Sequence, residues 1–278
     1  MLLLVPLYGQ TRYGMSSSSY IDWEKGTLFC TIEVDLEKKG TFTPSSRYRM
    51  ELAVDTRLPL IVQEDLQYAL VDSYNTMGRL MEMDPLLTQK MFRIAQEGHK
   101  TSSHLSKEMD QFVVRYRFDI YPDIVTPFIE HSRPYPLPRI IDYEPTTSFS
   151  GIVIYMKGVF PVHGEEKSEE LRPCLFPKIF DQQMQLIVES DMVPPDVLKN
   201  RGMAAYTDTL DEKPFINRIG YAPLRIIGTG IYGKHYTDVI IPMEASRKIL
   251  YSEKNRNLLT EGKILIICNS SRTELESD

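Results

Sequence analysis

The sequence has little cysteine or tryptophan, and it lacks a basic tract, a long apolar run and any C-x-x-C pair. Its 278 residues include 3 Cys and 1 Trp, and 32 Lys and Arg stand against 38 Asp and Glu, for a formal charge of −6. The lack of clustered cations excludes a nucleic-acid binder, because phosphate neutralisation requires them. No apolar stretch approaches the roughly 20 residues that span a bilayer, so we expect no transmembrane span.

The three cysteines predict neither a zinc site nor a disulfide framework, because no two are closely spaced and three allow at most one bridge. Cys30 is in phase with the alternating apolar residues of 28–36, and Cys268 ends the apolar run 264–267. We interpret both as small buried side chains rather than nucleophiles or ligands. Whether these two and Cys174 are all free thiols is left open.

The first ten residues, MLLLVPLYGQ, form a short apolar run before the serine-rich segment 11–19. A run of this length suits the h-region of a secretory signal, with small Gly9 near a candidate cleavage point, although no Lys or Arg precedes Arg12. We therefore expect a periplasmic, secreted protein. The alternative is a cytoplasmic protein whose apolar end docks on the fold as a strand.

The first half of the chain predicts strands at both ends and helices between them. Apolar and polar residues alternate over 28–36 and 112–120, and 20–23 is the expected hairpin partner of the earlier strand. Three helices are expected between these strands. The first begins at Pro44 and is interrupted by Pro59, and the second runs from about Val62 to Met81. The third is capped by Asp84, has Pro85 in its first turn and ends at Gly98.

The second half is rich in strand signals and follows a segment with prolines at 127, 134, 136, 138 and 145. Proline at this density continues neither a helix nor a central strand, so the domain connection is placed there. The expected strands are 151–156, 184–188, 224–227, 237–241 and 263–268, and the expected helices are 244–251 and a second one that Ser252 caps and Gly262 ends.

These elements predict an α+β protein of two mixed α/β modules, each a mostly antiparallel sheet packed by helices, joined by a Pro-rich segment. The expected divisions are a signal-like or unstructured N-terminus (1–19), an N-terminal β-α-α-α-β module (20–125), the Pro-rich connection (126–147), a C-terminal strand-rich module (148–268) and a polar, frayed tail (269–278).

One motif resembles a nucleotide site. The glycines of Gly228-Thr-Gly-Ile-Tyr-Gly233 match G-x-G-x-x-G and follow the expected strand 224–227. In a dinucleotide site such glycines let the backbone approach a pyrophosphate held at a helix N-terminus. Here a strand pattern, 235–241, comes next, and a helix begins only after Pro242. The context favours a β-turn-β connection and leaves a nucleotide- or ligand-binding enzyme as the alternative.

No other pattern assembles a reactive site, so no catalytic, cofactor-binding or metal-binding residue and no cofactor is assigned. The histidines, which form no H-E-x-x-H motif and are expected on the surface or singly bonded, are His99 and His104 in an apparent loop, His131, His163 and His235. Glu165, Glu166, Glu169 and Glu170 around Lys167 indicate a solvated loop. The methionines 77, 81, 83 and 91 indicate helix core. Asp238 before an apolar run is a possible buried carboxylate, although an exposed strand-entry residue is the ordinary expectation.

Several stretches together resemble the exported periplasmic proteins of spirochaetes that are similar to the FlgP-type flagellar accessory family. They are 21–27 (IDWEKGT), 173–181 (PCLFPKIFD), 223–230 (PLRIIGTG) through Thr237-Asp238, 244–249 (EASRKI) and 257–263 (NLLTEGK). The resemblance implies an α/β module near the outer membrane and the flagellar motor, and it implies no catalytic residue. The chain lacks the family's lipidation cysteine, so direct membrane anchoring is not expected.

The function predicted from these observations is a non-enzymatic periplasmic structural or assembly protein, associated with the flagellar motor or the cell envelope. Its expected partners are other envelope or flagellar proteins, with possible self-association, and binding through sheet edges is the expected mode. The alternative is a soluble α/β ligand- or nucleotide-binding enzyme that uses the turn Gly228–Gly233.

Overall fold

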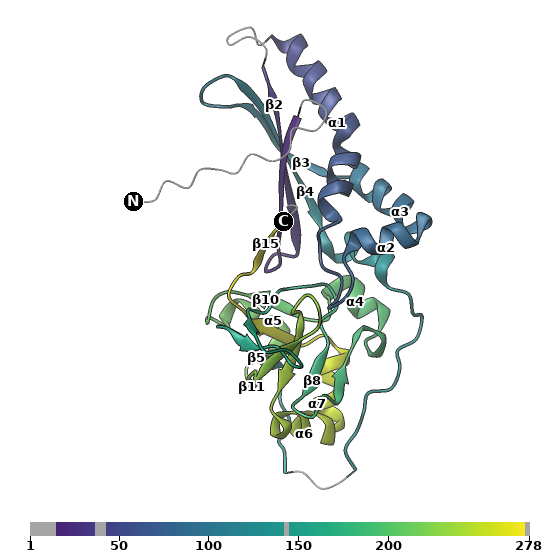
Figure 1. Ribbon diagram of the computed structural model, residues 1–278, viewed down its shortest axis with the longest axis vertical. Helices are drawn as coiled ribbons and strands as arrows, with labels where there is room; N and C mark the ends of the chain where they lie inside the picture. Colours follow the sequence, from purple (N-terminus) through teal and green to yellow (C-terminus); the bar gives the residue numbers. More distant parts are fainter. Residues whose placement is uncertain (1–14, 37–42, 142–144, 276–278) are drawn as a thin grey trace.

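Two α+β modules, stacked along the long axis of the molecule, account for the residues that the computed structural model describes, which are 15–36, 43–141 and 145–275 (Figure 1). The predicted fold class of two α+β modules is thereby confirmed. None of the helices in these segments is long and apolar enough to cross a membrane. The apolar run that predicts a secretory signal, with Gly9, lies outside the described residues.

The first module is built on a five-stranded antiparallel sheet with the strand order β15-β1-β2-β4-β3. Its strands are β1 (Met15–Asp22), β2 (Thr27–Asp35), β3 (His99–Leu105), β4 (Gln111–Asp119) and β15 (Arg272–Glu274). Alternation turns one apolar face inward, and its buried members include Leu28, Cys30, Ile32, Phe112, Val114, Tyr116 and Phe118. Helices α1 (Pro44–Leu66), α2 (Met77–Met83) and α3 (Pro85–Gln96) cover that face (Figure 1).

Helix α1 runs unbroken through Pro59, so the predicted interruption and the predicted helix over 62–81 are wrong. A proline inside a helix costs roughly 3 kcal/mol. Burying a leucine or isoleucine contributes roughly 1.5–3 kcal/mol, and Leu58 and Ile61 beside this proline are both buried. Packing on the sheet therefore outweighs the cost of the proline. The helix ends at Leu66, and the chain then leaves the helical path.

The other local predictions for the first module hold at the hairpin and at the third helix. β1 and β2 pair as a hairpin from Asp22 and Thr27 onward. The carboxylate of Asp84 accepts the backbone N–H of Leu86 at 2.9 Å and so caps α3, with Pro85 in the first turn. An acceptor at this position satisfies a backbone N–H that has no partner within the helix.

Three stretches without apolar alternation are strands, contrary to expectation. Residues 99–105, expected as a loop, form the edge strand β3, and residues 15–19, assigned to the unstructured N-terminus, form the first part of β1. The tail expected to fray from residue 269 contains β15, which pairs with residues 20–22 of β1, and its Leu275 is buried. Strand pairing at an edge rests on backbone hydrogen bonds, which side-chain periodicity does not report.

The second module contains two four-stranded sheets, ordered β10-β14-β5-β11 and β12-β13-β8-β9, and a two-stranded pair of β6 and β7. The strands are β5 (Ile152–Tyr155), β6 (Phe160–Pro161), β7 (Ser168–Glu169), β8 (Ile179–Asp181), β9 (Leu186–Val188), β10 (Ala205–Thr207), β11 (Leu224–Ile227), β12 (Gly230–Tyr232), β13 (Asp238–Ile241) and β14 (Ile264–Ile267). The helices are α4 (Pro195–Arg201), α5 (Ile216–Ile219), α6 (Met243–Tyr251) and α7 (Glu253–Thr260).

The predicted mostly antiparallel arrangement is wrong for this module. The sheet β10-β14-β5-β11 is parallel throughout, and the other sheet combines a parallel pair, β13 with β8, with antiparallel ones. Apolar alternation identifies the buried face of a strand but not its direction. The nearly continuous apolar runs of β5 and β14 are typical of central strands in parallel sheets, which are covered on both faces.

Each module contains a segment that packs into the other, in addition to the proline-rich connection between them. β15 follows the last strand of the second module and returns to the sheet of the first (Figure 1). Conversely, residues 67–76, here called the inserted loop, leave α1 and enter the second module. Its backbone carbonyls at Leu70, Val71 and Ser73 accept N–H groups of the second module at 2.8–3.2 Å. The proline-rich segment runs along the outside of the second module, where the ring of His131 hydrogen-bonds the carbonyl of Val193 at 2.8 Å (Figure 1).

Candidate functional site

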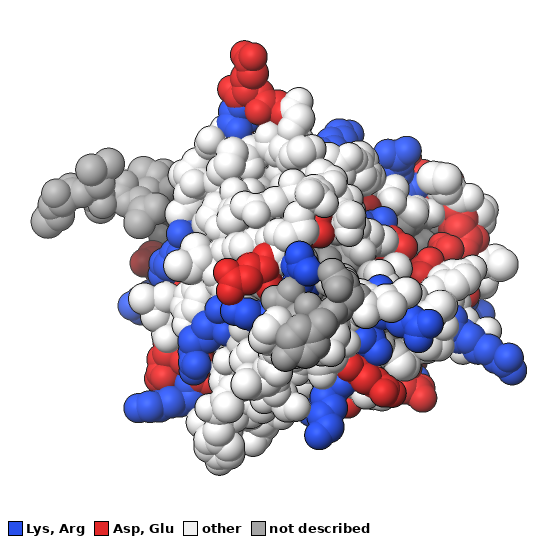
Figure 2. All heavy atoms as spheres, turned by 90° about the horizontal axis from the view of Figure 1, so that it is seen from below, with Lys and Arg blue, Asp and Glu red and all other residues white. Residues whose placement is uncertain are grey.

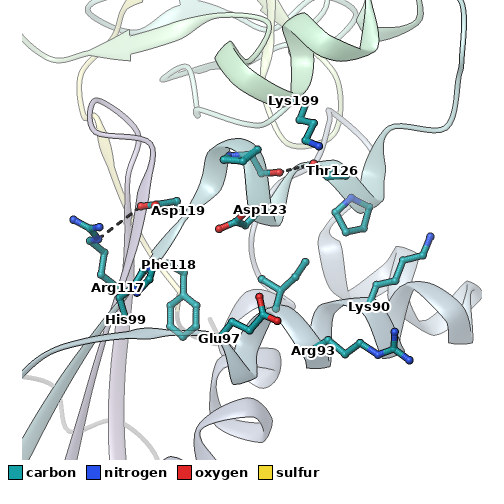
Figure 3. A pocket seen from close by; sticks show the side chains of 13 residues that line it. Lys90, Arg93, Glu97, His99, Arg117, Phe118, Asp119, Asp123, Thr126 and Lys199 are labelled. Carbon is teal, nitrogen blue, oxygen red and sulfur yellow. Dashed lines mark hydrogen bonds and ion pairs between the residues drawn. The ribbon is translucent and has the colours of Figure 1, made fainter.

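A pocket of about 420 Å³ opens where the two modules meet (Figure 3). Its walls come from α3, the ends of β3 and β4, the helical turns η1 (Ile120–Ile124) and η2 (Thr126–Phe128), and α4 of the second module. The lining residues are Lys90, Arg93, Ile94, Glu97, His99, Arg117, Phe118, Asp119, Pro122, Asp123, Thr126, Pro127 and Lys199. These residues are far apart in the sequence and share no motif, so the sequence patterns do not predict the pocket.

Charges of both signs line this pocket over an apolar floor. Arg117 and Asp119 neutralise each other across 3.7 Å between guanidinium and carboxylate. The hydroxyl of Thr126 donates to the carbonyl of Pro122, so it is engaged within its own turn (Figure 3). Glu97 and Asp123 have no ion pair with any described residue. Such a mixture suits the binding of a small polar or zwitterionic molecule better than that of a polyanion.

The inserted loop forms a second candidate site where it enters the second module, with Leu70, Val71 and Ser73 buried and Tyr74 exposed. Ser73 at its tip is fully buried, and the carboxylate of Asp72 holds the turn by accepting the backbone N–H groups of Tyr74 and Asn75 at 2.7 and 2.9 Å. The hydroxyl of Tyr74 hydrogen-bonds that of Tyr232 at 3.1 Å. The loop is therefore held by backbone and side-chain bonds together.

Asp238 lies beside this loop tip and is fully buried, so its expected place as an exposed strand-entry residue is wrong. One carboxylate oxygen accepts the backbone N–H of Lys178 at 3.0 Å. The other oxygen, and the hydroxyl of Ser73, have no hydrogen-bond partner among the described residues. Burial raises the pKa of Asp238 to about 6, although the hydrogen bond from the backbone N–H of Lys178 favours the charged form.

The glycine motif forms a β-turn-β connection, as predicted. β11 leads into β12, which pairs antiparallel with β13, and α6 begins only at Met243. The space in which a phosphate would approach is filled with protein atoms. A Cβ added at Gly228 would lie 1.9 Å from the sulfur of Met156, and one at Gly233 would lie 2.3 Å from the Cβ of Ser73. These glycines are required for close internal packing.

The histidines and cysteines do not assemble a reactive cluster in the part of the chain that the structure describes. No group of three or more His, Cys, Asp or Glu in those ranges is arranged to hold a metal ion. His99 lines the pocket between the two modules, here called the junction pocket, and His131, within the proline-rich segment, hydrogen-bonds the carbonyl of Val193. All three cysteines are free and buried, which confirms the interpretation of Cys30 and Cys268 as core side chains.

Comparison with protein families finds two matches along the chain. Residues 14–127 match the model described as Treponema pallidum Tp0624, N-terminal domain, and residues 151–270 match the model described as Treponema pallidum Tp0624, second domain. The chain is similar to Tp0624 over most of its length. A search of curated proteins finds no match.

The Tp0624 matches follow the two modules of the structure and leave most of the proline-rich segment unmatched. Because Treponema pallidum is a spirochaete, they agree with the spirochaete part of the resemblance seen in the sequence. Their descriptions name domains only and mention neither flagella nor export. The function must therefore be argued from the geometry of this chain.

Proposed function

We propose that this chain is a non-enzymatic structural or assembly protein of the periplasm, associated with the cell envelope or the flagellar motor. The observation that carries the proposal is the strand addition within the molecule, in which β15 from the far end of the chain pairs with only residues 20–22 of β1. Among the described residues, nothing pairs with Met15–Ser18 on that same side of β1. A sheet that accepts a strand in this way offers a partner protein the same backbone hydrogen bonds.

The interlocked modules support an assembly role. Trp23 and Glu24 of the first module contact Tyr206 and Thr207 of the second, with the Glu24 carboxylate accepting the Thr207 hydroxyl at 2.8 Å. Together with the inserted loop, these contacts fix one module on the other. A fixed two-module body transmits position between partners at its two ends, which is what a component of a larger structure requires.

The surface charge supports protein partners rather than a polyanion. Seen from below, acidic and basic side chains are interspersed, and neither sign gathers into one large patch (Figure 2). Mixed surfaces of this kind lack the concentrated positive field that draws nucleic acid. The formal charge of −6 also disfavours the binding of a polyanion such as nucleic acid.

The first test is compartment and phenotype. We expect the mature protein to begin near residue 10, as N-terminal sequencing would show, and to fractionate with the periplasm or envelope of the organism that encodes it. Deletion of the gene should disturb motility, envelope structure or cell shape. A protein that keeps Met1 and stays in the cytoplasm, or a deletion strain with normal motility and envelope, contradicts the proposal.

The second test separates this role from the nucleotide-binding alternative. A ligand present at a hundredfold its dissociation constant adds about 2.7 kcal/mol to the free energy of unfolding. Because protein atoms fill the space at Gly228 and Gly233, we expect mono- and dinucleotides to leave the melting temperature unchanged. A clear upward shift with one nucleotide, lost in Gly230→Val, favours the alternative instead.

A further inference from the structure

One edge of the parallel sheet in the second module is open. β11 is the last strand of the order β10-β14-β5-β11, and at the opposite edge β10 faces the first module through Tyr206 and Thr207. At the β11 edge, the side chain of Ile227 is 73% exposed and that of Tyr221, just before the strand, is 87% exposed. β11 lies on the outer side of the lower module (Figure 1).

The hydrogen-bond pattern shows which backbone groups of β11 face outward. Leu224 and Gly228 donate their N–H groups to the carbonyls of Gly151 and Tyr155, beside and within β5. Backbone groups of successive residues in a strand point to opposite sides. The N–H and C=O groups of Arg225 and Ile227 therefore point away from β5, and no described strand pairs with them.

The chain itself limits this edge to those two residues. Pro223, two positions before Arg225, has no N–H to donate. Thr229, two positions after Ile227, already donates its N–H to the carbonyl of Ile240 at 2.8 Å. The edge thus offers two N–H donors, those of Arg225 and Ile227, which makes it a short site with defined ends.

A second copy of the same edge can pair with this one antiparallel in three registers, of which one fits. If Arg225 faces Arg225 of the copy, two like charges stand directly opposite each other. Pro223 then faces Ile227 and has no N–H to donate to its carbonyl. If Ile227 faces Ile227, Arg225 faces Thr229, whose N–H is already used. If Arg225 faces Ile227 and Ile227 faces Arg225, both outward N–H groups of each copy are paired with carbonyls of the other, and no like charges are opposed.

We propose that a second copy of this chain adds to the β11 edge by antiparallel pairing of β11 with β11, in the register that places Arg225 opposite Ile227. The proposal deepens the proposed assembly function by naming a self-association site, and it rests on that function for its biological role. The resulting contact is twofold symmetric, so it closes at a dimer and creates no new open edge.

The side chains agree with this register. Arg225 is held by its own Glu212, with nitrogen–oxygen distances of 2.9 and 2.7 Å, so its charge is already neutralised beside the edge. Its aliphatic stem then lies against the exposed Ile227 of the second copy, and the same contact recurs across the twofold axis. Edge strands usually carry a lysine, a proline or a bulge that blocks pairing. β3 has a bulge between Lys100 and Ser102, whereas β11 is regular, its neighbouring Pro223 lies just outside the strand, and its one charge, Arg225, is neutralised by Glu212.

The first experiment measures mass in solution with the whole chain. Sedimentation equilibrium should show a monomer–dimer equilibrium that shifts to dimer as concentration rises. Ile227→Lys places a second cation directly opposite Arg225 of the other copy, at both ends of the twofold-symmetric contact, and should raise the dissociation constant at least tenfold. Leu52→Lys, on α1 of the first module and 54% exposed, is the matched control and should leave it unchanged. A wild-type chain that stays monomeric at its highest soluble concentration, or a dimer that survives Ile227→Lys, overturns the proposal.

The second experiment tests the register by disulfide trapping under mild oxidation. A mixture of Arg225→Cys and Ile227→Cys chains should give a covalent dimer, because these positions face each other in the proposed register, at a separation that a disulfide spans. Each variant alone should remain largely uncrosslinked, and the three native cysteines are buried. Equal crosslinking of Ile227→Cys alone indicates a different register and overturns this one. If the protein is monomeric yet fractionates with the envelope, the self-association fails while the proposed function stands.

Discussion

Trp23 packs edge-on against Tyr206, with ring centroids 5.8 Å apart, and this contact joins the first hairpin of the chain to the parallel sheet of the second module. The indole N–H of the same Trp23 donates to the hydroxyl of Thr273 in β15 at 2.9 Å. The only tryptophan of the chain therefore ties together three segments that are far apart in the sequence. Its position explains how two modules with separate sheets form a single body.

Replacement of Trp23 by alanine should destabilise the protein by about 3–5 kcal/mol, because it leaves a large cavity at the junction and removes the bond to Thr273. Chemical denaturation monitored by circular dichroism measures this change. Tyr48→Ala, at a side chain that is 67% exposed on α1, is the control and should stay within about 0.5 kcal/mol of the wild type. Equal effects of the two substitutions would show that the junction is not part of the cooperative core.

Asp238→Asn should flatten the dependence of stability on pH. Burial raises the pKa of Asp238 to about 6 from an ordinary value of 3.8, so the folded state holds this proton more tightly than the unfolded chain does. The stabilisation of the folded state by this proton is complete below about pH 4, is lost as the pH rises through 6, and is on the order of 3 kcal/mol. Urea denaturation at several pH values from 4 to 8 measures it, and parallel curves for variant and wild type contradict the assignment.

The sequence predicts helices and strands whose apolar residues recur with a regular period. Prediction fails where contacts between segments far apart in the sequence determine the structure. The alternation over 112–120 and the cap at Asp84 are local signals, and both appear in the structure as β4 and α3. The burial of Asp238 depends on an inserted loop some 165 residues earlier, which the local pattern at 237–241 does not reveal. Likewise, the junction pocket joins Lys199 to α3, and no spacing in the sequence relates them.

Gly233→Ala should cost more stability than Gly164→Ala. Both glycines have positive φ, +92° and +83°, so an alanine is strained at either position by about 1–2 kcal/mol. Only at Gly233 does the added Cβ also collide with Ser73, whereas the space at Gly164 is open. Thermal denaturation of the two variants measures the difference. Adding Ser73→Gly should recover part of the loss at Gly233 and none at Gly164, and a loss unaffected by Ser73→Gly would show that the inserted loop does not press on this turn.

The three cysteine thiols should not react with a thiol reagent in the native protein and should react after unfolding. Burial raises the pKa of Cys30 and of Cys268 to about 12, and it raises that of Cys174 further, so almost no thiolate exists at neutral pH. A colorimetric thiol assay at pH 7.5, with and without guanidinium chloride, counts the groups in each state. Reaction of the native protein should be limited by unfolding, so its rate should rise in the destabilised Trp23→Ala variant. Rapid labelling of one native thiol at a rate equal in both proteins would place that cysteine at an exposed site and remove it from the core.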